Sequence, residues 1–167
     1  MRNDFFQEVA ESGTELEKLL LKQVRQAILN VRNNVSTHLH EMIGFKGKWT
    51  GEKTFHFETE ITPFLFNLNQ AVHGGVLAYI ADTTMGSMVF QSLPPGKISV
   101  TSEMKINYIR AVHEGKLNTK AELLHLGKRS AVAECKLLSG NGELIAVSSA
   151  SFAILDRKSV LKKGNDQ

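Results

Sequence analysis

Residues 67–82 combine the side-chain types that chemistry on a carbonyl group requires. A His-Gly-Gly triplet, formed by His73, Gly74 and Gly75, opens a long apolar segment with the length of a helix. The first turn of a helix leaves backbone N–H groups without partners, and the helix dipole favours negative charge there. Glycine lets a ligand approach those N–H groups closely, which suits the oxyanion that forms when a carbonyl is attacked. A glycine-rich helix start that binds no ligand explains the triplet equally well.

Asp82 lies nine residues after His73, within the same apolar segment. Nine residues of helix span about 13 Å, so Asp82 cannot reach the first turn of its own helix. It could reach the first turn of a second copy if two such helices packed antiparallel across a twofold axis. A carboxylate in apolar surroundings is a stronger base, which suits a general base or a nucleophile. Alternatively, Thr83 and Thr84 satisfy Asp82 as a structural aspartate.

Asn67 precedes His73 by six residues, and its side-chain amide can both donate and accept hydrogen bonds. It could therefore orient a water molecule or a substrate carbonyl. Asparagine is also common in loops, and Asn69 lies close by, so a purely structural role stays open.

The sequence contains no other catalytic pattern. It lacks a nucleophile elbow, a phosphate-binding loop and a dinucleotide fingerprint, and its six histidines have no metal-ligand spacing. The single cysteine, Cys135, lies in an alternating apolar run, so we expect a buried strand residue and not a nucleophile. One cysteine cannot form an internal disulfide, which suits a reducing cytoplasm.

Residues 73–92 predict the helix that positions this site. Apolar side chains occur nearly all round it, and a helix without a polar face is a buried helix. Four strand-like runs follow, at about 97–111, 116–126, 129–139 and 143–155. The Asn-Gly pair before the last run is a strong hairpin signal.

The first third of the chain has a different pattern. At 14–31 apolar residues recur at three- and four-residue steps after a capping box, which predicts an N-terminal helix. Residues 33–45 predict a turn, and the alternation from Trp49 to Ile61, with a slip near Gly51, predicts one strand. One buried helix with several long strands predicts an α+β fold, in which a long antiparallel sheet wraps around the central helix.

The length of 167 residues suits one domain, which we place at 46–157. A helical extension at 1–45 would precede it, and a basic C-terminal tail at 158–167 would follow it. The net charge of +3 is small and scattered, so we expect no nucleic-acid partner, although a polyanionic ligand could bind. The absence of a long apolar run and of a signal peptide predicts no association with a membrane and a cytoplasmic location.

Taken together, Asn67, His73-Gly74-Gly75 and Asp82 at these spacings resemble the active-site motif of the PaaI-like hotdog thioesterases. The likeness covers about 47–156, where 99–111 resembles the family's long strand after the helix and 127–130 its turn near CoA. It implies the hotdog fold and hydrolysis of an acyl-CoA substrate to free acid and CoA. It also implies a homo-oligomer built as a dimer of hotdog dimers, and no metal or redox cofactor.

The resemblance further implies the roles of individual residues. Asn67 and Gly74 of one subunit would bind and polarise the thioester carbonyl, while Asp82 of the opposite subunit would activate water or attack directly. Thr101 would position the water, with Ser102 and Ser99 as open alternatives. His73 completes the catalytic set. The predicted substrate-binding residues are Gly75, Ser102, Tyr108, Arg110, Gly127, Lys128, Arg129 and Ser130.

Two other functions are alternatives to hydrolysis. A non-catalytic acyl-CoA-binding hotdog protein, such as a lipid sensor or regulator, would need an output module, and 1–45 is too short for a convincing helix-turn-helix. A hotdog dehydratase or hydratase would place a catalytic histidine and a carboxylate differently. The position of Asp82 argues against both. The acyl group stays open, as does the choice between CoA and acyl-carrier-protein thioesters, and the extension could cover the helix or an acyl tunnel.

Overall fold

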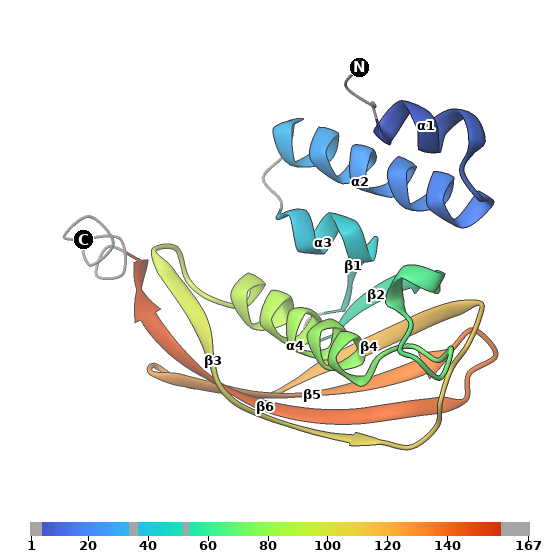
Figure 1. Ribbon diagram of the computed structural model, residues 1–167. Coiled ribbons are helices and arrows are strands. Elements are labelled where there is room, and N and C mark those ends of the chain that lie inside the picture. Colours follow the sequence, from blue (N-terminus) through green and yellow to red (C-terminus); the bar gives the residue numbers. More distant parts are fainter. Residues whose placement is uncertain (1–4, 34–36, 52–53, 158–167) are drawn as a thin grey trace.

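The chain begins with three helices and continues as a sheet that curves around a fourth (Figure 1). The computed structural model describes residues 5–33, 37–51 and 54–157. The helices are α1 (Phe5–Ser12), α2 (Glu15–Asn33), α3 (His38–Ile43) and α4 (Gly74–Gln91), with a 3-10 turn, η1 (Pro63–Leu65), before α4. The strands are β1 (Lys46–Gly51), β2 (Thr54–Glu60), β3 (Lys97–Tyr108), β4 (Lys116–Leu126), β5 (Ser130–Ser139) and β6 (Leu144–Asp156).

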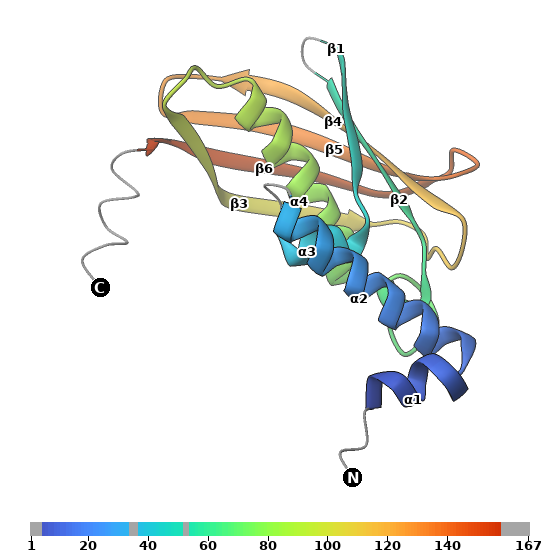
Figure 2. The ribbon, with the colours of Figure 1, turned by 90° about the horizontal axis from the view of Figure 1, so that it is seen from above.

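The six strands form one antiparallel sheet in the order β1-β2-β4-β5-β6-β3. Helix α4 crosses its concave face, as the view from above shows (Figure 2). This arrangement confirms the predicted α+β architecture and the predicted central helix. Strand β3 closes one end of the sheet, so one of its long sides has no neighbouring strand among the described residues.

Helix α4 is the centre of the core because its side chains are apolar on nearly every side. Met85, Met88 and Val89 are fully buried, and they pack in one cluster with the inward-facing residues of the strands. On β5 those inward positions are occupied by Ala131, Ala133, Cys135 and Leu137. Small side chains at several of these positions let the helix lie close to the sheet.

The N-terminal region differs from the prediction in three ways. A separate helix, α1, precedes the predicted helix, which is α2. The segment at 33–45 is not only a turn, because it contains α3, which Thr37 caps and Gly44 ends in a left-handed conformation (φ 75°). The alternation from Trp49 to Ile61 is not one strand. The chain reverses after Gly51, and β1 pairs with β2, as with Trp49 opposite Phe55. The predicted tail at 158–167 lies outside the described residues.

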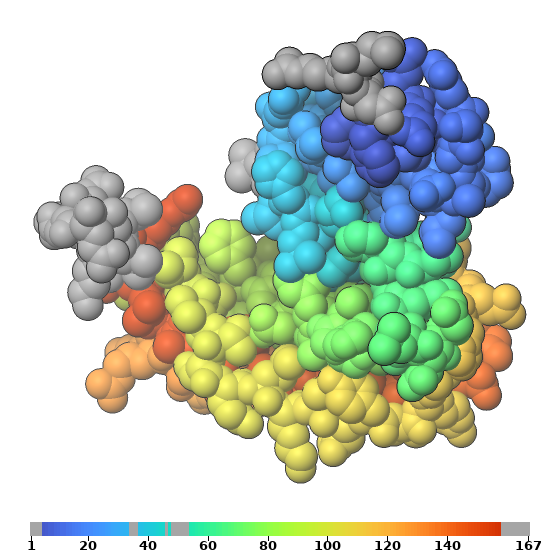
Figure 3. Space-filling view, in the orientation of Figure 1, coloured from blue at the N-terminus to red at the C-terminus, as the bar shows by residue number. Residues whose placement is uncertain are grey.

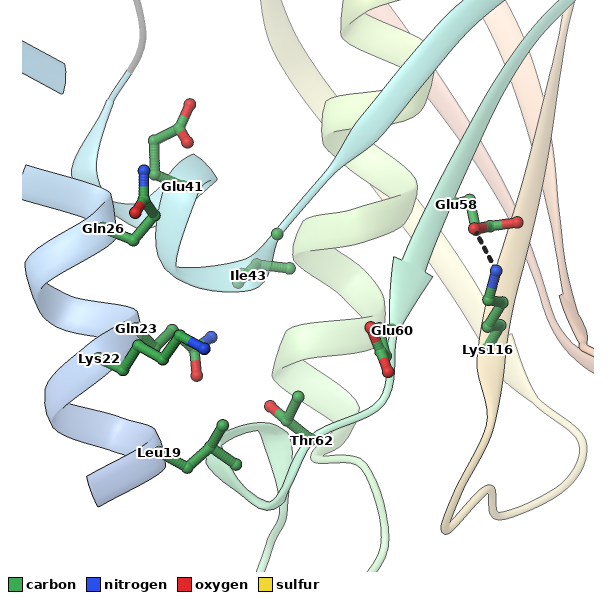
Figure 4. A pocket seen from close by; sticks show the side chains of 11 residues that line it. Leu19, Lys22, Gln23, Gln26, Glu41, Ile43, Glu58, Glu60, Thr62 and Lys116 are labelled. Atoms are coloured by element: carbon green, nitrogen blue, oxygen red, sulfur yellow. Dashed lines mark hydrogen bonds and ion pairs between the residues drawn. The ribbon is translucent and has the colours of Figure 1, made fainter. Parts of the chain in front are cut away.

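The N-terminal helices are attached to the sheet through α3. The side chain of Gln23 on α2 donates to the carbonyl of Met42, and Asn30 donates to Glu41 at 2.6 Å. A pocket of about 340 Å³ remains between α2 and α3 on one side and β2 and β4 on the other (Figure 4). A Lys116–Glu58 ion pair of 2.7 Å lies at its strand side. No helix among the described residues is long and apolar enough to cross a membrane.

We expect Met88→Ala to lower the free energy of unfolding by about 2–5 kcal/mol, because it opens a cavity in the centre of the core. Urea denaturation followed by circular dichroism measures this change. Leu68→Ala is the matched control, since Leu68 is fully exposed and its loss should change stability by less than about 0.5 kcal/mol. Equal effects of the two substitutions would contradict the role of α4 as the core.

Candidate active site

Helix α4 begins directly after His73, which closes part of the first turn. The carbonyl of His73 accepts the N–H groups of Val76 (2.9 Å) and Leu77 (3.1 Å). Its Nδ1 atom accepts the N–H of Gly75 at 2.9 Å, so the imidazole caps the helix. Within the described residues, the N–H of Gly74 has no protein acceptor. The helix start therefore offers one backbone donor to a ligand, and that donor belongs to Gly74.

The loop before the helix holds the side chain of Asn67 in one orientation. The backbone of Asn67 bonds to the carbonyl of Ala71 at 2.8 Å, and its Oδ1 accepts the N–H groups of Asn69 (2.8 Å) and Ala71 (3.3 Å). Gln70 closes this turn in a left-handed conformation (φ 60°), which is uncommon for a residue with a side chain. Because Oδ1 is occupied, Asn67 can only donate to a ligand, through Nδ2.

Tyr108 and Arg110 hold backbone groups around this end of the helix. The Tyr108 hydroxyl donates to the carbonyl of Gly74 at 2.9 Å. Arg110 donates from its guanidinium to the carbonyl of Leu144 at 3.1 Å. Both residues were predicted to contact substrate, and the contacts that they make in this chain are structural.

Asp82 lies two and a half turns further along α4, facing β3. Its Oδ1 accepts a hydrogen bond from the Thr101 hydroxyl at 2.8 Å. The alternative of a structural aspartate satisfied by Thr83 and Thr84 fails for Thr84, whose hydroxyl donates to the carbonyl of Ile80 (2.7 Å) and pairs with Thr119 (3.0 Å). Asp82 is also only partly buried in the single chain, because it lies on the side of α4 that faces the sheet's open edge.

A β-bulge determines which hydroxyl reaches Asp82. The pairing of β3 with β6 shifts between Thr101 and Glu103, so Ser102 is the extra residue of the bulge. Of the three hydroxyl residues that the prediction left open, Thr101 is the one that contacts the carboxylate. Ser99 and Thr101 both line a pocket of about 310 Å³ at Asp82.

This pocket contains residues that the sequence did not single out for a site. Its lining includes Gly86 and Ser87 of α4 and Phe152 of β6. A Cβ atom at position 86 would come within 3.7 Å of the Phe152 ring, an ordinary contact, so the glycine leaves room above that ring. Asp82 and Gly86 are one helical turn apart, so the sequence could have predicted that they share one face of the helix.

The turn at 127–130 joins β4 to β5 at the Asp82 end of the molecule. Gly127 donates to the carbonyl of Ser130 at 2.8 Å, and the carbonyl of Arg129 accepts the N–H of Ile154 at 2.9 Å. Ile154 pairs with Ser99, which is close to Thr101 along β3. Lys128 and Arg129 are exposed, so this turn presents two cations beside that end of the sheet.

The predicted catalytic residues therefore form two separate groups in one chain. The first half-site contains Asn67, His73 and Gly74 at the start of α4, and the second half-site contains Asp82 and Thr101. About 12 Å of helix separates Gly74 from Asp82. A substrate carbonyl held by Gly74 lies too far from Asp82 of the same chain for chemistry, which needs contact at about 3 Å.

The described residues offer neither a metal site nor a reactive cysteine. Among the described residues, no group of three His, Cys, Asp or Glu side chains lies close enough together to hold a metal ion. Cys135 is fully buried in β5, and burial raises the pKa of its thiol to about 12. A protonated, inaccessible thiol cannot act as a nucleophile, which confirms that Cys135 is a structural strand residue.

Comparison with known proteins identifies the family. Residues 69–146 match the model of the thioesterase superfamily. The crystal structure of BH2602 from Bacillus halodurans with CoA is 31% identical and superposes with a TM-score of 0.81, covering 87% of this chain and 97% of that one. The PaaI protein of E. coli has the same fold at 20% identity (TM-score 0.67, 80% of this chain and 96% of that one).

Among curated proteins, the proofreading thioesterase EntH of Cronobacter sakazakii is 33% identical over 85 residues, which are 50% of this chain and 61% of EntH. The matched segments span 61 to 71% of the length of the curated relatives. With the helix-wrapping sheet and the structural match to BH2602, these findings show that the chain belongs to the thioesterase superfamily and has the hotdog fold.

We expect the Cys135 thiol to resist alkylation by iodoacetamide in the folded protein from neutral pH up to about pH 10. Burial raises the pKa of this thiol to about 12 and shields it, so almost no thiolate is available below that pH. In urea the thiol should react readily, with an ordinary pKa of about 8.5. Mass spectrometry measures the labelled fraction, and rapid labelling of the native protein at neutral pH would contradict the buried position.

Proposed function

We propose that this protein hydrolyses acyl-CoA thioesters to the free acid and CoA, in active sites that two subunits share. The observation that carries the proposal is the separation of the two half-sites along α4. The first has hydrogen-bond donors for a carbonyl oxygen and no carboxylate among its residues, whereas the second has a carboxylate and no backbone donors of that kind. Each half-site supplies what the other lacks.

The proposed mechanism uses each group in the role that its hydrogen bonds leave open. The Gly74 N–H and the Asn67 Nδ2 donate to the thioester oxygen and stabilise the negative charge that develops there. Asp82 of the second subunit takes a proton from water while the water oxygen bonds to the carbonyl carbon. The C–S bond then breaks, and the thiolate leaves as CoA and takes up a proton. Direct attack by the carboxylate is the alternative first step.

Thr101 supports this step because its hydroxyl donates to Asp82 Oδ1. The hydroxyl oxygen keeps lone pairs that can accept a hydrogen bond from the attacking water. Asp82 Oδ2 has no protein partner among the described residues, so it can face the same water. His73, whose Nδ1 caps the helix, keeps the Gly74 N–H directed outward and acts as a positioning residue.

Strand β3 supports the shared site because it leaves a long sheet edge open. This strand has 12 residues and is mostly exposed, and long open edges are normally paired or covered in natural proteins. Antiparallel pairing of β3 with β3 of a second copy would extend the sheet. It would also set the two α4 helices antiparallel, with each first half-site beside the other subunit's second half-site. We propose that two such dimers form the tetramer that the family resemblance implies.

Recognition of CoA is proposed for the turn at 127–130 and for the residues around it. Lys128 and Arg129 can pair with the phosphates of CoA, and Ser130 and the Gly127 backbone can contact its polar arm. BH2602 was solved with CoA, which favours CoA over a carrier-protein thioester. A non-catalytic acyl-CoA-binding role remains the second candidate, but it gives the Asp82–Thr101 hydrogen bond no purpose. The single buried cysteine is compatible with the cytoplasm, where we place the protein.

We expect Asp82→Asn to lower kcat for acyl-CoA hydrolysis by at least about a hundredfold, because the amide can neither accept the water proton nor attack. Thr101→Val should lower kcat by about tenfold through loss of the hydrogen bond to the carboxylate, and Thr101→Ser should retain most activity. Release of free thiol measures the rates. Asp156→Asn is the matched control, because this aspartate pairs with Lys97 at 2.9 Å, outside both half-sites. Full activity of Asp82→Asn would refute the assignment.

Mixing two inactive variants tests whether the site is shared. Gly74→Pro removes the proposed donor, and the backbone suits proline, because Gly74 is the first helical residue and His73 is extended (φ −62°, ψ 134°). Refolding Gly74→Pro together with Asp82→Ala should restore about a quarter of wild-type activity, since half of random dimers are mixed and each mixed dimer has one intact site.

Gly74→Ala is the control for this experiment. It keeps the N–H, and its Cβ would meet the Tyr108 ring at 3.4 Å, an ordinary contact, so it should stay active. Mixed dimers that form, as shown by differently tagged subunits, but that recover no activity would mean that each site lies within one subunit.

A further inference from the structure

A separate pocket of about 660 Å³ opens beyond the first half-site, and the N-terminal extension forms one of its walls. Asn67 and His73 lie in its lining, which places it directly beside the proposed position of the thioester carbonyl. The space-filling view shows the blue N-terminal helices resting on the green segment that carries this loop (Figure 3). The lining residues are Leu16, Pro63, Phe66, Asn67, Leu68, Asn69, Gln70 and His73.

The start of α2 is held firmly enough to serve as a wall. Glu17 accepts hydrogen bonds from the backbone N–H of Thr14 (2.7 Å) and from its hydroxyl (2.8 Å), and Thr14 accepts the N–H of Glu17 at 3.3 Å. This is the predicted capping box, and its hydrogen bonds lower the pKa of the Glu17 carboxyl group. Leu16 lies between Thr14 and Glu17, so the capping box fixes the position of its backbone.

The exposed side chains of this pocket indicate an apolar occupant. Leu16 is 45% exposed and Leu68 is fully exposed, although both are large aliphatic residues. Pro63 and Phe66 extend the same surface toward Asn67. Apolar side chains gathered in a pocket beside a reactive group are typical of ligand sites, in which they are covered when the ligand binds.

Charge decides which part of the substrate fits. The described residues that line this pocket include no lysine or arginine, so it offers nothing to the phosphates of CoA. The cationic turn with Lys128 and Arg129 lies near the second half-site, since Arg129 bonds to Ile154, which pairs with Ser99. In the proposed shared site, that half-site is on the other side of the thioester. With CoA extending toward that turn, the acyl group extends the opposite way, past Asn67 and into this pocket.

We infer that α2 forms the outer wall of the acyl pocket and that Leu16 contacts the far end of an extended aliphatic acyl chain. The inference rests on the proposed hydrolase function and adds to it the substrate class and a specificity-determining residue. Leu16 takes no part in the chemistry. It limits the length of chain that the pocket accepts, and chains too short to reach it gain no binding energy from it.

The test compares Leu16→Trp and Leu16→Ala with the wild type over saturated acyl-CoAs of increasing chain length. Leu16→Trp fills the pocket and should lower kcat/KM about tenfold for the longest wild-type substrates while sparing the short ones. Leu16→Ala opens the pocket and should shift the preference toward longer chains. Val24→Trp is the matched control, since Val24 is similarly exposed on the same helix (39%) and does not line this pocket.

The outcomes separate this inference from the function on which it rests. A wild-type protein that hydrolyses no acyl-CoA refutes the proposed function, and the inference falls with it. Asp82-dependent hydrolysis with an unchanged chain-length profile in both Leu16 variants refutes the inference alone. An equal loss for all chain lengths in Leu16→Trp also refutes it, because the pocket then holds a part that all substrates share, such as the pantetheine arm. The Val24→Trp profile must match the wild type, and circular dichroism checks that each variant is folded.

Discussion

The length of helix α4 between Gly74 and Asp82 is the constraint on which the rest of the site depends. One face of this helix is fully buried against the sheet, which holds the helix in place, so these two residues stay about 12 Å apart. The donor side of the chemistry is fixed at the first turn by the His73 cap, and the carboxylate is fixed by Thr101. Since neither group can move to the other, the proposed chemistry requires a second chain to bring them together.

The same rigidity explains why the fold was largely predictable from the sequence. A helix without a polar face and four alternating runs admit few arrangements other than a sheet around a helix, and the observed strands agree closely with the predicted runs. The N-terminal region was less predictable. Helix α3 has only six residues, too few for a periodic pattern, and the reversal between β1 and β2 preserves an alternation that looks like one strand.

The residue types of the site were visible in the sequence, but their contacts were not. Asp82 looked unpaired because its partner, Thr101, is nineteen positions away and reaches it from the strand beside a bulge. No local pattern predicts a bulge at Ser102. The sequence alone therefore does not determine which of the three hydroxyl residues contacts Asp82. Similarly, that Asn67 only donates follows from two backbone N–H groups that occupy its Oδ1 in the folded loop.

The proposed catalytic groups and Leu16 lie on different elements, and this affects how substrate preference can vary. The donors and the carboxylate lie on or against α4, where most substitutions would disturb the core. Leu16 lies on α2, which is joined to the sheet mainly through α3 and its bonds from Gln23 and Asn30. A change at Leu16 can therefore alter the shape of the proposed acyl pocket without disturbing Gly74 or Asp82 on α4. In the proposed enzyme, α2 is thus a suitable place to set substrate preference, because it contributes no residue to the core cluster around α4.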